Sequence, residues 1–71
     1  MPIRKHIALG QERTTLALEP PFWEAIALLA GNGGVNAWIE KQLAAKPETE
    51  ARASWVRQRV LGEMVKKVKF A

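Results

Sequence analysis

The sequence contains no cysteine, no tyrosine, a single histidine and a single serine. Without cysteine the chain can form no disulfide, and one histidine is too few for the usual zinc sites, so we expect no metal. His6, Ser54 and the scattered carboxylates provide no plausible nucleophile, base and orienting acid. We therefore expect neither an enzyme nor a cofactor, and the absence of cysteine is consistent with a cytoplasmic protein.

Long apolar runs are also missing. No stretch approaches the roughly 20 residues of a membrane span, and no apolar region follows Arg4 and Lys5 as it would in a signal peptide. A chain of 71 residues makes one small domain with a limited core, and such domains often depend on disulfides, metals or oligomerisation. With the first two excluded, oligomerisation is the device that remains.

Positive charge is in excess, with eleven lysines and arginines against seven acidic residues and a net charge of +4. This balance favours a polyanionic partner, which is nucleic acid or, less readily, an anionic membrane surface. A soluble protein with a basic face is an equally good interpretation of composition alone.

The clearest local pattern is a strand from Arg13 to Leu18, which Glu19 and two prolines bring to an end. Alternate residues fall on two faces, namely Thr14, Leu16 and Leu18 on one and Arg13, Thr15 and Ala17 on the other. No second strand of matching quality follows it. Since a lone strand needs a partner for its backbone groups, we expect it to pair with the same strand of a second copy.

The preceding residues 1–12 have a weaker pattern. The segment from His6 to Leu9 could extend as a strand or an arm, and Gly10 interrupts it. Arg4 and Lys5 gather positive charge there, and we expect a basic arm that contacts a polyanion, with a frayed terminus as the alternative. His6 is expected to be a plain surface side chain.

Three helices are predicted from the 3.6-residue spacing of apolar side chains. They run from about Pro21 to Ala30, from near residues 34–36 to about Ala45, and from about Pro47 to Val68. The apolar face of the first helix consists of Phe22, Ile26, Leu29 and Ala30, flanked by Trp23. That of the second helix consists of Val35, Trp38, Ile39 and Leu43. That of the third consists of Val56, Val60, Met64 and Val68, with Leu61 and Val65 beside them.

The charges of the last helix follow the helix dipole, with Glu48 and Glu50 expected in its first turn and Lys66, Lys67 and Lys69 near its end. We expect its apolar stripe to cover the body of a dimer. A basic amphipathic helix lying on a membrane is the rival interpretation.

The start of the second helix is a candidate phosphate site. Its first backbone N–H groups have no partner within the helix, and Gly33 and Gly34 have no side chain to obstruct an anion. Asn36 can add an amide donor. The loop lacks a Gly-Lys-Ser/Thr sequence and joins two helices, so a nucleotide site is not expected.

The order strand, helix, glycine turn, helix over residues 13–45 resembles the ribbon-helix-helix family of DNA-binding repressors. The resemblance rests on the segments Arg13 to Pro20 and Phe22 to Ile26 and on the pair Val35-Asn36. It is closest to a small bacterial subgroup with an Arg-Thr-x-Leu-x-Leu-Glu-Pro-x-Phe-Trp pattern. In that subgroup an Arg-Lys segment with a nearby glycine precedes the strand, and a further helix follows, as residues 53–57 indicate here.

The resemblance implies a mostly α fold with one short strand, an obligate dimer with an intermolecular two-stranded antiparallel ribbon, and an extra C-terminal helix. It divides the chain into a basic N-terminal arm (1–12), a ribbon-helix-helix core (13–45) and a C-terminal helix packing on the dimer (46–71). The implied partner is double-stranded DNA with a palindromic operator, and dimers can stack along it. The implied activity is transcriptional repression, with the ribbon in the major groove.

The resemblance also assigns roles to residues. Base reading falls to Arg13, Thr15 and Ala17, and phosphate binding to Gly34, Val35, Asn36, Arg4 and Lys5. The dimer core is assigned to Thr14, Leu16, Leu18, Phe22, Ile26, Leu29, Val35, Trp38, Ile39 and Leu43. Two positions depart from the family pattern, because Ala17 replaces a longer polar side chain and Gly34 replaces a serine or threonine cap.

Two other functions are open at this point. An antitoxin would bind its operator through the ribbon and a toxin protein through the C-terminal helix. A membrane-surface or purely structural dimer is the third possibility, although the acidic residues expected at the start of the last helix disfavour a membrane.

Overall fold

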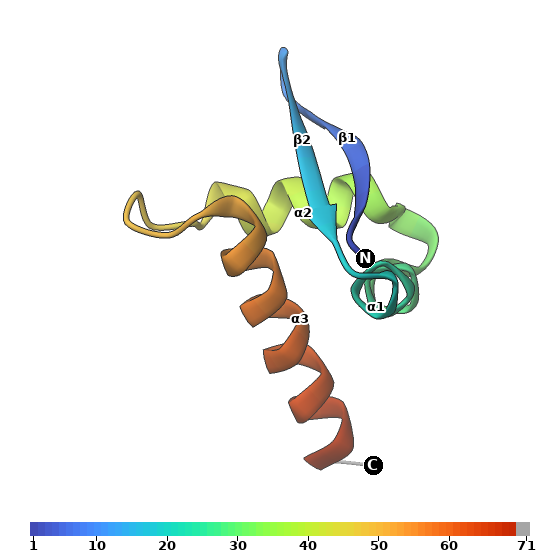
Figure 1. The fold of residues 1–71 in the computed structure, drawn as a ribbon. Coiled ribbons are helices and arrows are strands. Elements are labelled where there is room, and N and C mark those ends of the chain that lie inside the picture. Colours follow the sequence, from blue (N-terminus) through green and yellow to red (C-terminus); the bar gives the residue numbers. More distant parts are fainter. Residues whose placement is uncertain (70–71) are drawn as a thin grey trace.

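The computed structural model describes residues 1–69. It contains a two-stranded antiparallel sheet followed by three α-helices (Figure 1). The elements are β1 (Ile3–Leu9), β2 (Glu12–Leu18), α1 (Pro20–Ala30), a short 3-10 turn η1 (Gly31–Gly33), α2 (Val35–Ala44) and α3 (Arg52–Lys69). The last positions of the expected segment 46–71 lie outside the described residues. No helix within residues 1–69 has the length and apolar character needed to cross a membrane.

The strand predicted at residues 13–18 has its partner within the chain, so the expectation of a single unpaired strand is wrong. β1 runs antiparallel to β2, with Ile3 opposite Leu18 and Leu9 opposite Glu12. The tight loop begins at Gly10, whose φ of 62° is a left-handed conformation that glycine adopts without strain. Residues 3–9 thus form a strand rather than an arm, and a second copy is not required to satisfy one edge of β2.

A lysine on the core-facing side conceals β1 in the sequence. Ile3, Lys5 and Ile7 share that face, because they lie opposite Leu18, Leu16 and Thr14. The Lys5 ammonium lies 5.2 Å from the centre of the Trp23 ring, a cation–π contact that lets a charged side chain accompany apolar neighbours.

The hydrophobic core lies between the hairpin and the helices of the same chain. Its buried members are Ile7, Leu16, Leu18, Trp23, Ile26, Ile39, Val56 and Val60. Of the expected core residues, Phe22, Leu29, Val35, Trp38 and Leu43 are partly buried against this cluster, and Thr14 is half-buried. The expected inward face of β2 and the apolar faces of α1 and α2 are therefore confirmed, while their role in a dimer stays a prediction.

The last helix begins later than predicted. α3 starts at Arg52, and the residues after Pro47 form a turn in which the Glu50 N–H donates to Pro47 O at 3.1 Å. Lys46 Nζ holds this turn by donating to Pro47 O at 3.0 Å and to Glu50 O at 2.7 Å. Glu48 and Glu50 therefore precede the helix rather than occupy its first turn, so the dipole argument does not apply to them.

α3 passes through Gly62 without a break, and its two halves differ in environment. The first half packs on β2, α1 and α2 through the buried Val56 and Val60. The second half runs away from the hairpin (Figure 1), and Leu61, Val65 and Val68 there are 56, 61 and 77% exposed. The expected apolar stripe is thus covered over only part of its length within the chain.

We expect Ile7→Ala to lower the free energy of unfolding by about 2–4 kcal/mol, because this side chain is 3% exposed and its removal leaves a cavity under the sheet. Chemical denaturation measures the effect. Ile3→Ala is the matched control, since Ile3 lies on the same face of β1 but is 43% exposed. Equal small losses for both variants would mean that β1 is not packed on the core.

Candidate nucleic-acid interface

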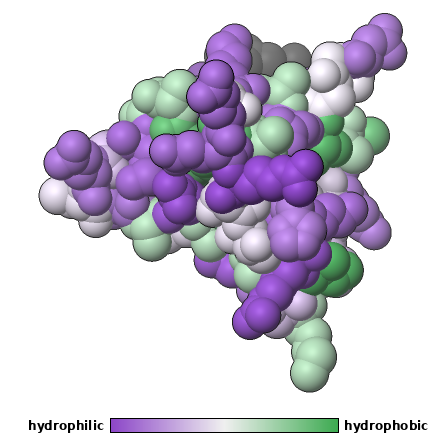
Figure 2. Space-filling view, turned by 90° about the horizontal axis from the view of Figure 1, so that it is seen from above, coloured by the Kyte–Doolittle hydropathy of each residue, from purple (hydrophilic) through white to green (hydrophobic). Residues whose placement is uncertain are grey.

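The outward face of the hairpin gathers most of the polar side chains that the sequence marked. The strand register places Arg4 opposite Ala17, His6 opposite Thr15 and Ala8 opposite Arg13, on the side away from Leu16 and Leu18. All of these side chains are exposed except Ala17, which is half-buried. Figure 2 views the molecule from the hairpin end, and hydrophilic side chains cover most of that surface.

The three residues expected to read bases, Arg13, Thr15 and Ala17, therefore do share one outward face. Pairing with β1 adds three side chains to it, the polar Arg4 and His6 and the small Ala8. His6 was expected to be a plain surface residue, but its Nδ1 lies 3.2 Å from Thr15 Oγ1. In the sequence, the only sign that His6 belongs to this face is its two-residue spacing from Arg4 and Ala8. That spacing places His6 on the face only once residues 3–9 are known to be a strand.

Arg4 and Lys5, which were expected to act together on phosphate, point to opposite faces of β1 because side chains alternate along a strand. Arg4 joins the outward face, whereas Lys5 lies on the core-facing side over Trp23. Trp23 also donates from Nε1 to Ile3 O at 2.9 Å, which fixes the start of β1 against α1. Lys5 is thus separated from the polar face by the sheet itself.

The start of α2 is occupied in part by the hairpin. The Asn36 amide binds both polar groups of Ala8, accepting from its N–H at 2.9 Å and donating to its C=O at 3.0 Å. One turn later, Glu40 accepts from the Gly10 N–H at 2.8 Å. The Asn36 side chain is therefore already hydrogen-bonded to the hairpin. The first helical bond of α2 is donated by Trp38 to Gly34 O, so the Val35 N–H has no acceptor within the helix.

The two edges of the sheet differ. The backbone N–H and C=O of Ala8 point away from β2, and those of its partner Arg13 therefore point away from β1. Because this orientation repeats at every second residue of an antiparallel pair, the backbone groups of Thr15 and Ala17 also point away from β1. Among the described residues only one bond to these outward groups occurs, a 3.4 Å contact from Arg57 Nη2 to Ala17 O. The β1 edge is thus covered by α2 at Ala8, and the β2 edge is open at Arg13 and Thr15.

Arg57 joins α3 to the junction of β2 and α1. Its guanidinium donates to both carboxylate oxygens of Glu19, from Nε at 2.9 Å and from Nη2 at 3.1 Å, and lies 5.9 Å from the centre of the Phe22 ring. The hydrogen bonds from Arg57, together with a backbone hydrogen bond, lower the pKa of the Glu19 carboxyl. This fork fixes α3 beside the open edge.

Comparison with family models, with curated proteins and with solved structures found no match. Within residues 1–69 no group of three or more His, Asp or Glu side chains is placed to hold a metal ion. The charge, exposure and backbone geometry of the hairpin are therefore the features that bear on function.

The Glu19–Arg57 pair predicts a pH-dependent contribution to stability. A carboxyl whose pKa is lowered in the folded state stabilises the fold above its unfolded pKa, and that stabilisation is lost as the pH falls through the folded value. Glu19→Gln should therefore lower the Tm at neutral pH and have no effect once Glu19 is protonated in both states. Glu48→Gln removes the same charge from the exposed turn and serves as the control. If Glu19→Gln lowers the Tm by the same amount at neutral pH and at a pH where Glu19 is protonated, the Glu19–Arg57 pair is not the source of the stabilisation.

Proposed function

We propose that the protein is a dimeric, sequence-specific DNA-binding transcriptional repressor of the ribbon-helix-helix type, with no enzymatic activity. The observation that carries this proposal is the exposed face of Arg13 and Thr15 beside the open edge of β2. An exposed strand edge is a template for pairing with another strand, and a second β2 is the simplest partner. The net charge of +4 per chain supports a polyanionic target.

The outward backbone groups define the register of the proposed dimer. Antiparallel pairing through Arg13, Thr15 and Ala17 places Thr15 opposite its own copy and Arg13 opposite Ala17. The two arginines are then kept apart, and the small Ala17 leaves room for each of them, so that no like charges face one another. Arg57 gives up its long contact with Ala17 O in this arrangement and keeps both bonds to Glu19.

The proposed dimer has a sheet of four strands, with the two β2 strands at the centre. At a strand spacing of about 4.8 Å, the outermost strand axes are about 14 Å apart, whereas the major groove is about 12 Å wide. The β2 pair thus enters the groove and each β1 lies over its wall, where Arg4 meets phosphates. The Gly34 N–H is taken by Gly31 O at 3.4 Å, so the Val35 N–H is the backbone group at the start of α2 that supplies a further phosphate contact.

Within the groove, each side chain of the β2 pair has a distinct part. Arg13 can donate two hydrogen bonds to a guanine edge, Thr15 can bond a base or contact a thymine methyl, and Ala17 can offer only a methyl contact. Sequence preference in this proposal therefore comes chiefly from Arg13 and Thr15.

Arg13→Ala should weaken binding to the preferred site by about 1–3 kcal/mol and broaden base preference at one position of each half-site. A site recovered by selection from random DNA and fluorescence anisotropy provide the measurement. Lys67→Ala is the matched control, because it removes one exposed positive charge far along α3. If both variants lose affinity equally and keep the same base preference, Arg13 acts only as a charge.

Thr15→Pro should abolish the dimer while preserving the hairpin. The Thr15 N–H points away from β1, so a proline there removes only a group that the second copy would bind, and edge positions tolerate proline. Sedimentation measures the association state and circular dichroism the fold. Thr15→Val keeps the N–H and should remain dimeric. A Thr15→Pro protein that is folded and still dimeric would place the interface elsewhere.

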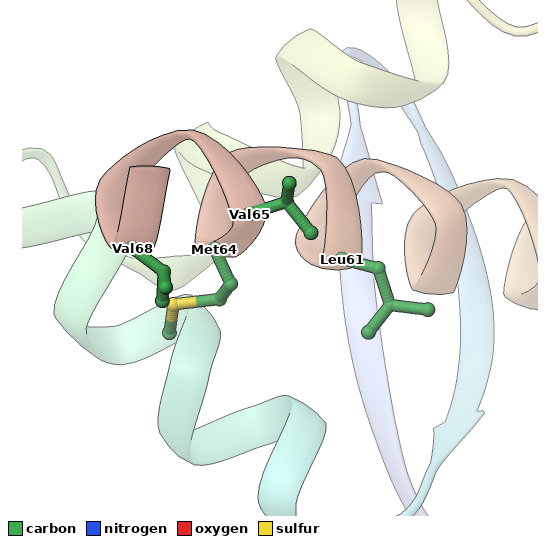
Figure 3. Close-up of a pocket in the computed structure, with 4 residues that line it drawn as sticks. All are labelled: Leu61, Met64, Val65 and Val68. Atoms are coloured by element: carbon green, nitrogen blue, oxygen red, sulfur yellow. The ribbon is translucent and has the colours of Figure 1, made fainter. Parts of the chain in front are cut away.

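One observation favours a second candidate, an antitoxin that binds its operator through the ribbon and a toxin through α3. Leu61, Met64, Val65 and Val68 line a shallow apolar pocket on the second half of α3 (Figure 3). An exposed apolar surface of this kind is typical of protein-binding sites. For an antitoxin, Val65→Asp should end protection against the toxin and leave operator binding intact. A repressor alone has no such protection to lose, and its operator binding should also be unchanged.

A further inference from the structure

The hydrogen bond between His6 and Thr15 lies at the centre of the outward face. The two residues are direct partners in the register, and Thr15 Oγ1 is 3.2 Å from His6 Nδ1. Both side chains are exposed. A hydroxyl has one proton to donate and lone pairs to accept with, so the direction of this bond decides what Thr15 can offer to a third group.

We propose that His6 is a positioning residue that sets whether Thr15 recognises a base as an acceptor or as a donor; this rests on the proposed function. With no proton on Nδ1, the Thr15 hydroxyl donates to His6, and Oγ1 presents only lone pairs outward. Those lone pairs suit the amino groups of adenine or cytosine in the major groove.

Protonation of the imidazole reverses the bond. His6 takes one proton from solvent, Nδ1–H then donates to Thr15 Oγ1, and the Thr15 hydroxyl proton becomes free to point outward. A donor at this position suits the acceptor atoms of guanine, or O4 of thymine. Since histidine is the side chain that ordinarily changes charge between about pH 5 and 8, base preference at the Thr15 contact depends on pH.

The surroundings of His6 are mainly cationic. Arg4 and Arg13 share its face, while Lys5 and Glu12 lie on the opposite one. Of the helices, α2 brings Glu40 to the Gly10 N–H, α3 brings Arg52 Nη1 to within 3.1 Å of Thr14 Oγ1, and α1 contributes the neutral Trp23 at Ile3. The charged side chains of the hairpin that share the outward face with His6 are therefore both arginines.

The test is a selection of bound sites from random DNA at about pH 5.5 and about pH 8. At the central positions we expect adenine or cytosine, which present an amino group in the major groove, to be enriched at the higher pH. We expect guanine or thymine to be enriched at the lower pH. A change of roughly three- to tenfold corresponds to one net hydrogen bond. His6→Val should bind DNA without the pH-dependent change, and Thr15→Val should lose preference at those positions at both pH values.

Nitrogen-15 NMR of the His6 ring gives a second measurement that needs no DNA. At the higher pH Nδ1 should be the unprotonated nitrogen, and it should gain a proton at the lower pH. An Nδ1 that is already protonated at the higher pH overturns the inference, as does a pH-dependent preference that persists in His6→Val or is absent from the unaltered protein. Those results leave the proposed function in place, whereas a protein that selects no sites at either pH removes both.

Discussion

The register of β1 against β2 is the constraint on which the rest of the molecule depends. Side chains alternate along a strand, so a slip of one residue would turn Arg4 and His6 into the core and Ile7 out of it. Three contacts hold the register from different directions. Gly10 closes the loop, Trp23 binds Ile3 at the start of β1, and Asn36 binds Ala8 near its end. The apolar core and the polar face are two results of this one alignment.

The same alignment makes the sheet asymmetric. Helix α2 satisfies the outer edge of β1 at Ala8, near the loop, whereas Arg13 and Thr15 leave the outer edge of β2 open to strand addition. α3 lies beside β2, where Arg52 bonds the Thr14 side chain and Arg57 makes a long contact with the outward carbonyl of Ala17. A surface with one open strand edge and one exposed polar face suits association in pairs and contact with a groove. Those two properties are what the proposed repressor needs.

Much of this architecture follows from local pattern. The alternation at residues 13–18 identified β2 and its two faces, and the spacing of Ile26, Ile39 and Val56 within their helices identified buried positions. For β1, the sequence left a strand or an arm open over His6 to Leu9 and did not show its first half, because Lys5 interrupts the apolar face. The cation–π contact that accommodates Lys5 joins residues distant in sequence. The start of α3 was misplaced because Pro47 followed by glutamates imitates a helix start, while the Lys46 ammonium binds the carbonyls of a turn there.

The candidate site shows the same division. The two-residue period placed Arg13, Thr15 and Ala17 on one face and the family resemblance marked that face as a site, but the addition of His6 depended on knowing its cross-strand partner. The hydrogen bonds of the Asn36 side chain could not be predicted either, because they join Asn36 to Ala8, 28 positions away in the chain. Contacts between distant segments, rather than propensities, determine which polar groups are free.

The bidentate contact of Asn36 has a consequence for the chemical ageing of the protein. The Asn36 amide is both the acceptor for the Ala8 N–H and the donor to the Ala8 C=O, whereas an ionised carboxylate can only accept. Deamidation to aspartate would leave two oxygens facing the site, one of them against the Ala8 carbonyl, and would release the outward backbone groups of Ala8. An exposed strand edge is a template for pairing with other chains, so slow loss of this amide during storage should favour aggregation.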